Sequence, residues 1–353
     1  MSERTRGQPI NWYWIPVDRE LIAALSRRSD WLGALQTLGF LAVLACTGSL
    51  AYYSAAHFPS YATIALLFLH GTCWAFLANA VHELSHGSVF ATLPLNRVFL
   101  ALFGFLRWIN PVLFWTSHGE HHKFAQYPSD DLESGSFAAV TLREYLMKAV
   151  INLEGLRWAI TSTLRHAQGR VAGEWEEHLF PDSKPELRYQ LTVWARAFLA
   201  GHVILLVVAL YFHLWMLPVV TTLAPFYGGA LQWICNQSQH AGLPGEVPDF
   251  RLCSRTIYLN PVLEFMYWHM NYHTDHHIYA AVPCYRLARL HRALRADLPP
   301  CPRGLLATWR EIIGTWRKQR SDPSYRFIAA VPPRRGRVAP AAPRPVAGSA
   351  APE

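Results

Sequence analysis

Long apolar runs alternate with polar, charged stretches along the chain. Residues 31–55, 61–81 and 214–234 contain no Asp, Glu, Lys or Arg, and residues 190–212 contain only Arg196. A helix needs about 20 mostly apolar residues to cross a bilayer. The pattern therefore predicts four transmembrane helices that form two hairpins.

The two predicted hairpins have very short connectors, at residues 57–60 and at His213, and neither connector holds Lys or Arg. Apart from Arg196, every Lys and Arg lies before residue 31, between residues 81 and 190, or after residue 240. Cytoplasmic loops carry the excess of Lys and Arg in membrane proteins. We therefore predict that both termini and the middle segment are cytoplasmic, in the inner or plasma membrane of a bacterium.

The remaining segments complete an all-α, polytopic membrane fold. Residues 96–115 are apolar but interrupted by Arg97, Arg107 and Pro111, which predicts a helix lying in the membrane interface. Residues 144–188 mix charged and aromatic side chains and predict a helical cytosolic cap. We expect a cytosolic segment over residues 1–30, a membrane domain over residues 31–327 and a disordered Pro/Ala-rich tail over residues 328–353.

Composition agrees with a membrane protein, because 52% of the 353 residues are hydrophobic and only 16% are charged. An ordinary soluble chain is about 25% charged. The net charge of +8 suits a cytoplasmic face that meets anionic lipid better than it suits a nucleic-acid partner. The first 30 residues are polar, so membrane insertion is expected to depend on internal segments. The cysteines form no CxxC pair and are expected to be free thiols.

Eight of the 17 histidines fall in three short runs, HELSH, HGEHH and HTDHH. Spacings of three and four residues place the imidazoles of each run on one face of a helix. Imidazole is a good ligand for iron, copper, nickel and zinc. Eight ligands are too many for one ion, so the sequence predicts two metal ions. The eight residues are His82, His86, His118, His121, His122, His273, His276 and His277.

Two other functions are compatible with part of this histidine pattern. HELSH alone fits the HExxH pattern of zinc proteases, but the two HxxHH runs have no role in such an enzyme. A non-catalytic metal-binding or transport protein would also keep histidines at a membrane edge, although it would need no closed site for two metals. Isolated histidines, among them His70, His202 and His291, are expected to be packing residues, and His269 remains ambiguous.

In its three runs the chain resembles the membrane fatty acid desaturase superfamily, whose signature is HxxxH, HxxHH and HxxHH. The likeness includes NQSQHAG, similar to an element that supplies a further imidazole, and VPCYRLARLH after the third run. By that resemblance His240 is a ninth ligand, and Asn236 reaches metal through a water molecule. The first run has three intervening residues where acyl-CoA desaturases have four, which favours lipid-linked or more divergent branches.

The resemblance implies a non-haem di-iron enzyme that uses O2 to desaturate an aliphatic chain, most simply a fatty acyl lipid. Hydroxylation, or desaturation of an amino-acid-derived metabolite such as dihydrorhizobitoxine, are the alternatives. The sequence contains no nucleotide-binding loop and no ferredoxin-type cysteine run. Electrons are therefore expected from a separate ferredoxin or cytochrome-type donor with its reductase. No residue beyond the metal ligands is expected to be catalytic.

The sequence also offers candidates for the groups around the ligands. Metal-binding imidazoles usually donate their second ring nitrogen to a carboxylate or carbonyl. Arg251 and Arg255 are candidates for holding a substrate headgroup. The candidate carboxylates are Glu83, Glu120, Asp130, Asp131, Asp249, Glu264 and Asp275.

Overall fold

The protein is described by a computed structural model that covers residues 6–133 and 141–334. Within these residues all regular secondary structure is helical, and β-pairing is limited to three isolated bridges. The all-α prediction is therefore confirmed for the described part of the chain. Three helical segments are long and apolar enough to cross a membrane, or four if one bent pair forms a span.

The first predicted hairpin is formed by helices α2 (Asp30–His57), α3 (Ser60–Ala75) and α4 (Leu77–Ser85). Ser29 caps α2, because its hydroxyl accepts a hydrogen bond from the Leu32 amide. Helices α3 and α4 together make the second candidate span, Ser60–Ser85, although the helix is interrupted at Phe76. Gly48 lets α2 and α3 approach closely, since a Cβ there would lie 3.0 Å from the His70 ring. Both candidate spans agree with the predicted positions.

The segment predicted as one interfacial helix consists of two. Helix α5 (Leu93–Arg107) ends at Trp108, which adopts a left-handed conformation, and α6 (Pro111–Phe124) begins three residues later at an angle of 102°. The Asn110 side chain caps α6, and Pro111 suits the first turn because that position lacks an intrahelical amide partner. The prediction of a single helix over residues 96–115 is therefore wrong, because the chain turns at Trp108 and a second helix begins after the Asn110 cap.

Helices α7 (Leu142–Ala149), α8 (Leu153–Ala167) and α9 (Gly173–Leu179) make up the predicted helical cap. They lead into α10 (Pro185–Tyr211), the third candidate span, which packs along α8 and α6. The Asn110 amide donates to the Leu191 carbonyl of α10 at 3.0 Å. This contact fixes the start of α6, which carries the second histidine run, against the span.

The fourth predicted span, residues 214–234, is not one helix. It divides into α11 (Met216–Val220), the short 3-10 helix η2 (Ala224–Phe226) and α12 (Ala230–Gln237). Pro218 and Pro225 lack the amide that a helix interior needs, and Gly228 has a positive φ of 73°. A side chain at Gly228 would also collide with the α3 backbone, 2.8 Å from the Thr72 nitrogen. Apolar composition alone did not reveal these breaks.

The C-terminal part folds back as five helices, α13 (Phe250–Cys253), α14 (Pro261–Met266), α15 (His273–Ile278), α16 (Leu287–Leu294) and α17 (Gly304–Gln319), with the 3-10 turn η3 (Cys284–Arg286). The predicted tail starts as an ordered segment: the Pro332 carbonyl accepts from Arg251 at 3.1 Å, and Arg334 lies 3.5 Å from Asp249. Residues 335–353 lie outside the described part of the chain.

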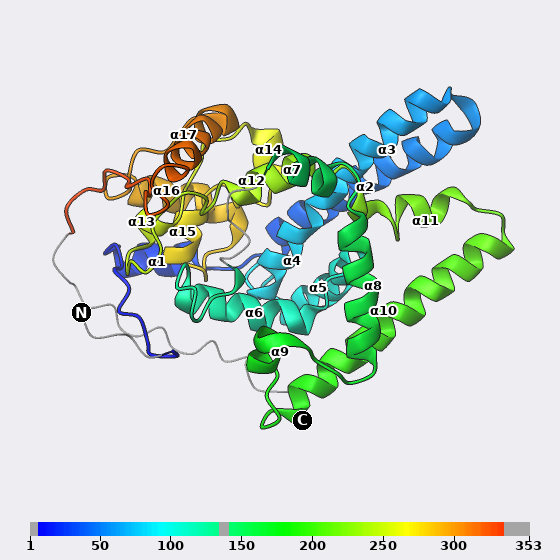
Figure 1. The fold of residues 1–353 in the computed structure, drawn as a ribbon, viewed down its shortest axis with the longest axis horizontal. Helices are drawn as coiled ribbons and strands as arrows, with labels where there is room; N and C mark the ends of the chain where they lie inside the picture. Colours follow the sequence, from blue (N-terminus) through cyan, green and yellow to red (C-terminus); the bar gives the residue numbers. More distant parts are fainter. Residues whose placement is uncertain (1–5, 134–140, 335–353) are drawn as a thin grey trace.

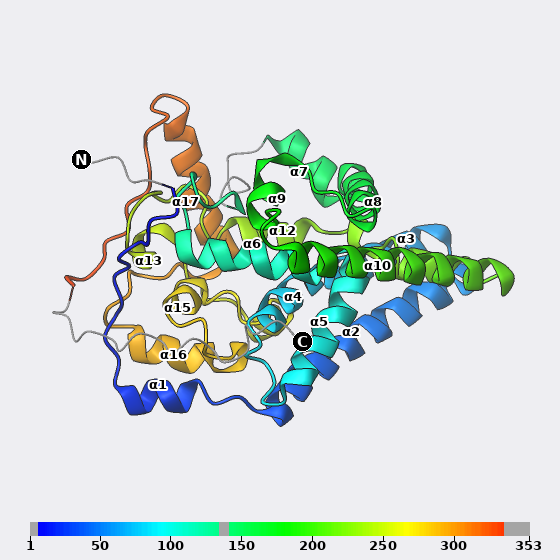
Figure 2. The same cartoon turned by 90° about the horizontal axis from the view of Figure 1, so that it is seen from below.

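The two short connectors lie at the same end of the molecule. In Figures 1 and 2 the α2–α3 tip and the α10–α11 tip both point away from α15, α16 and α17. In the opposite direction, residues 6–17 run past α6 and α13 to α1 (Arg19–Leu25). This arrangement separates the apolar hairpin tips from the part of the fold that carries the histidine runs.

Candidate metal centre

The three histidine runs lie on helices that meet at the end of the molecule opposite the α2–α3 and α10–α11 tips. HELSH forms the last turn of α4 and its cap residue, HGEHH ends α6, and HTDHH forms most of α15. Helix α4 packs against α6, and α15 packs against α13 and α16. The fold therefore brings together residues that are almost 200 positions apart in the sequence.

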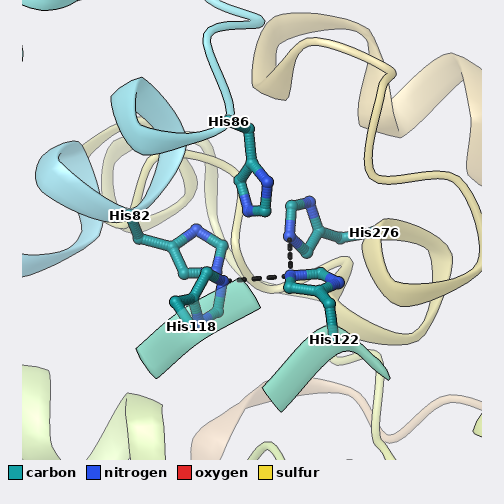
Figure 3. A group of neighbouring side chains, drawn as sticks. All are labelled: His82, His86, His118, His122 and His276. Carbon is teal, nitrogen blue, oxygen red and sulfur yellow. Dashed lines mark hydrogen bonds between the residues drawn. The ribbon is translucent and has the colours of Figure 1, made fainter. Parts of the chain in front are cut away.

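All nine histidines predicted as ligands fall into two compact groups. In each group the candidate ligand atoms lie within 4.8 Å of one another. Figure 3 shows the imidazoles of the first group turned toward a common centre. The first group is His82, His86, His118, His122 and His276, and the second is His121, His240, His273 and His277.

The two groups are neighbours, and each draws on more than one run. His122 of the first group and His277 of the second have ring centroids 4.6 Å apart. His118 and His122 alternate with His121 along α6, so successive positions on one helix serve different groups. The arrangement can accommodate two metal ions side by side.

The imidazole nitrogens converge as metal ligands would. In the first group the Nε2 atoms of His118 and His122 are 3.0 Å apart, and in the second those of His240 and His273 are 2.8 Å apart. Among the described residues, no hydrogen-bond partner reaches the buried Nε2 atoms of His82 and His86. Buried polar atoms without partners are costly, and the donor set suits iron. The residues therefore fit a metal pair.

Several of these imidazoles are oriented through the opposite ring nitrogen. The Nδ1 atom of His82 lies 3.0 Å from Glu83, and that of His118 lies 3.3 Å from Glu133. The Nδ1 atom of His121 lies 2.9 Å from Asp131, and that of His240 lies 2.7 Å from the Cys253 carbonyl. Such contacts fix the tautomer and turn Nε2 toward the metal.

Burial keeps the C-terminal histidines of the two groups neutral. It lowers the pKa of His273, His276 and His277 well below the ordinary value, with further lowering from neighbouring imidazoles. Burial, followed by the nearby His121, lowers the pKa of His240 to about 3. These side chains are thus unprotonated at neutral pH, the form that binds metal.

An open cavity of about 330 Å³ ends on this centre. Its wall includes His86, His118 and His122 of the first group and His277 of the second, so one occupant can lie beside both groups. Pockets for apolar ligands are typically concave and lined by aromatic side chains. The remaining wall residues are Trp14, Ser85, Trp115, Gly119 and Ala280.

Other sequence candidates have hydrogen-bond partners outside the two histidine groups. Asn236 accepts a hydrogen bond from Asn79 at 3.1 Å, within a buried polar chain that continues to Gln232. Asp275 contacts the lone His291 at 3.1 Å, and Glu264 contacts His269 at 3.1 Å. Of the candidate carboxylates, Glu83 and Asp131 hydrogen-bond to a predicted ligand.

Sequence reasoning missed Glu133, Ser117 and the Cys253 carbonyl. Glu133 follows α6 after a turn-rich segment, and Ser117 donates to it at 2.8 Å. No periodic pattern marks these positions, and a backbone carbonyl leaves no trace in composition. The acidic run that contains Asp131 and Glu133 was the only available signal.

Arg251 and Arg255, the headgroup candidates, are engaged inside the protein. Arg251 is buried and binds Asp249 through two nitrogens, at 3.0 and 2.9 Å. Arg255 binds Glu311 at 2.8 Å and the Ser238 carbonyl at 2.6 Å. Both guanidinium groups thus link segments of the fold.

The lone histidines in the spans have packing contacts. His70 lies 2.9 Å from both Thr47 and the Val220 carbonyl. The His202 ring stacks on Trp108 at a centroid distance of 3.9 Å. Neither belongs to the two histidine groups.

Fold and site together define a helical membrane protein with a paired histidine centre below an open cavity. The chain belongs to the fatty acid desaturase family, because the family model matches residues 56–306, most of its length. It is also 28% identical over 216 residues to the sphingolipid delta(4)-desaturase DES1-like protein of Oryza sativa subsp. japonica. That match covers 60% of this chain and 57% of the relative's length.

Proposed function

We propose that this protein is a di-iron desaturase that removes two hydrogens from neighbouring carbons of an aliphatic chain, with O2 as oxidant. One observation carries the proposal: a single cavity reaches imidazoles of both histidine groups. The five histidines around His122 would hold one iron, and the four around His273 would hold the other. When bound, the irons would supply the oxidising power needed to cleave an unactivated C–H bond.

The chain's own residues would contribute binding, orientation and protection from water. Neutral imidazoles add no charge to the centre and leave open coordination positions for oxygen. Glu83, Asp131 and Glu133 hold the imidazoles of His82, His121 and His118 by hydrogen bonds. Buried walls around the centre limit side reactions with water.

The cavity favours an uncharged segment of the substrate. None of its described wall residues is Asp, Glu, Lys or Arg. A hydrocarbon chain loses little hydration free energy on entering such a site. An amino-acid-derived substrate would have to place its charged groups there without partners, which costs free energy. A fatty acyl or long-chain-base lipid is therefore the proposed substrate class. The likeness to a sphingolipid desaturase supports this choice.

An external donor would supply the electrons. Helix α16 buries Leu287, Leu290 and Leu294 and exposes Arg289 and Arg292. This basic face suits an acidic redox protein of the ferredoxin or cytochrome type, because complementary charges speed association. We place this face, both termini and the histidine centre on the cytoplasmic side of the membrane.

Mass spectrometry of lipids and small metabolites from cells with and without the gene tests the function. Desaturation yields species lighter by two hydrogens, and hydroxylation yields species heavier by one oxygen. A lipid product of either kind, lost on His276→Ala, supports the metal centre. If only amino-acid-derived metabolites changed, the proposed lipid substrate would be wrong.

A further inference from the structure

An extended N-terminal segment wraps over the candidate metal centre. We call residues 7–17 the strap. It lies outside residues 56–306, the part that matches the family, so family membership does not account for it. In Figure 2 it runs along one side of the molecule, past α6 and α13, before α1 begins.

The strap is attached to the fold along its length. The Gly7 amide donates to Asp130 at 2.6 Å, the Trp12 indole donates to the Lys123 carbonyl at 2.9 Å, and the Ile15 carbonyl accepts from Tyr279 at 2.8 Å. Trp12 and Ile15 are buried. These contacts hold the strap against the segments that follow two of the histidine runs.

Trp14 lies between the buried residues Trp12 and Ile15, but its own side chain is not buried. Its side chain is 38% exposed and forms part of the wall of the 330 Å³ cavity. Phe250 and Tyr279 flank the indole, with centroid distances of 6.2 and 6.1 Å. Phe250 in turn stacks on His277. An aromatic path therefore joins Trp14 to the second histidine group.

A second tryptophan completes the wall. Trp115 is 41% exposed and lies three residues before His118 on α6, hence on the same helix face. Large apolar side chains left exposed at a cavity indicate a binding surface for an apolar ligand. The same wall includes Gly119 and Ala280, whose small size leaves room for an occupant.

We propose that Trp14 is a specificity-determining residue that, together with Trp115, positions an aliphatic chain beside the histidine centre. The proposal rests on the proposed function, because it assigns substrate contacts to the same site. The strap thereby determines which carbons of the aliphatic substrate lie beside the two histidine groups. Indole faces suit this task, because they offer large rigid apolar area at low entropy cost.

Gly119 provides a test that is independent of the strap. A Cβ added at Gly119 would meet no protein atom within 4 Å, so the position opens onto free space. Gly119→Leu should fill part of the cavity without a clash. Replacing glycine in a helix also favours folding.

The experiment uses the full-length, iron-loaded protein in lipid nanodiscs and stearic acid with a diazirine at mid-chain. After irradiation, peptide mass spectrometry should find adducts on residues 7–17 and on α6. For Trp14→Ala, the probe concentration giving half-maximal labelling of α6 should rise at least about tenfold, and Trp14→Phe should restore most of the affinity. Gly119→Leu should lose labelling at both sites.

Trp31→Ala is the matched control, because Trp31 is 76% exposed at the start of α2, away from the cavity wall. It should label like the unmodified protein. Adducts confined to α2 and α10, or labelling of α6 unaffected by Gly119→Leu, would overturn the proposal. Labelling at both predicted sites without any desaturated or hydroxylated product would instead refute the proposed function and leave the binding site standing.

Discussion

At the residue scale, the imidazoles are held by partners that differ in chemistry. Glu133 connects one ligand candidate to a neighbouring helix: it lies against His118 and accepts from Ser117, which accepts from the Trp175 indole of α9 at 3.1 Å. A helix of the cap is thus linked by hydrogen bonds to a proposed ligand. Orientation of His118 depends on a residue that no histidine pattern indicates.

Replacing Glu133 by Gln should lower product formation about 10–100-fold, because the neutral amide holds the His118 ring less firmly. Product per mole of protein and iron per chain would be measured by mass spectrometry. Glu120→Gln is the control, since Glu120 lies in the same run but pairs with the exposed Lys123 at 2.9 Å. Equal losses in both variants would show that charge near α6 matters, rather than the contact to His118.

Ligands and packing histidines should respond differently to truncation. His118→Ala, His122→Ala, His240→Ala or His276→Ala should abolish product while the protein still inserts, because each removes a nitrogen from a metal site. His202→Ala should keep most activity, since its ring stacks between Trp108 and Phe105 outside both groups. Lipid analysis and a membrane-fraction immunoblot provide the measurements. An inactive His202→Ala beside an active His240→Ala would require a different ninth ligand.

At the element scale, the apolar composition of the sequence predicted where long helices lie, but it did not predict where proline and glycine interrupt them. Two predicted runs matched the spans Asp30–His57 and Pro185–Tyr211 within a few residues, because bilayer thickness imposes a length that apolar composition reveals. The break over residues 214–234 depends instead on Pro218, Pro225 and the close approach of Gly228 to α3. The histidine spacing predicted which residues would gather, but their division into two groups depends on how α4, α6 and α15 meet.

The positions of the hairpin tips lead to a topology prediction. Cysteines at Ser60 and His213 should react with an impermeant thiol reagent from the non-cytoplasmic side, because both lie at the same end of the molecule. A cysteine at the exposed Ala296, which follows α16, should react only after the membrane is opened. The measurement is mass-tag labelling of intact and permeabilised cells, with the exposed Cys46 replaced by Ser. Labelling of Ala296→Cys in intact cells would show that the protein has the opposite orientation in the membrane.

At the scale of the whole molecule, the candidate metal centre connects segments that the chain keeps far apart. The nine histidines lie on α4, α6 and α15 and in the turn after α12. Helices α4, α6 and α15 and the turn after α12 therefore share one buried polar centre. The Nε2 atoms of His240 and His273 approach to 2.8 Å, and a metal ion held between such nitrogens would connect these segments. Metal binding and folding are therefore expected to be coupled.

Iron should therefore stabilise the folded protein substantially. A ligand that binds only the folded state adds about 4 kcal/mol when its concentration is about 1,000 times its dissociation constant. We expect the midpoint of thermal unfolding in nanodiscs to be several degrees higher with Fe²⁺ under anaerobic conditions than after chelation. His276→Ala should show a smaller shift, because it removes a ligand of one group, whereas His202→Ala should keep the full shift. An unchanged midpoint for the unmodified protein, with iron bound by metal analysis, would show that the ions do not connect these segments.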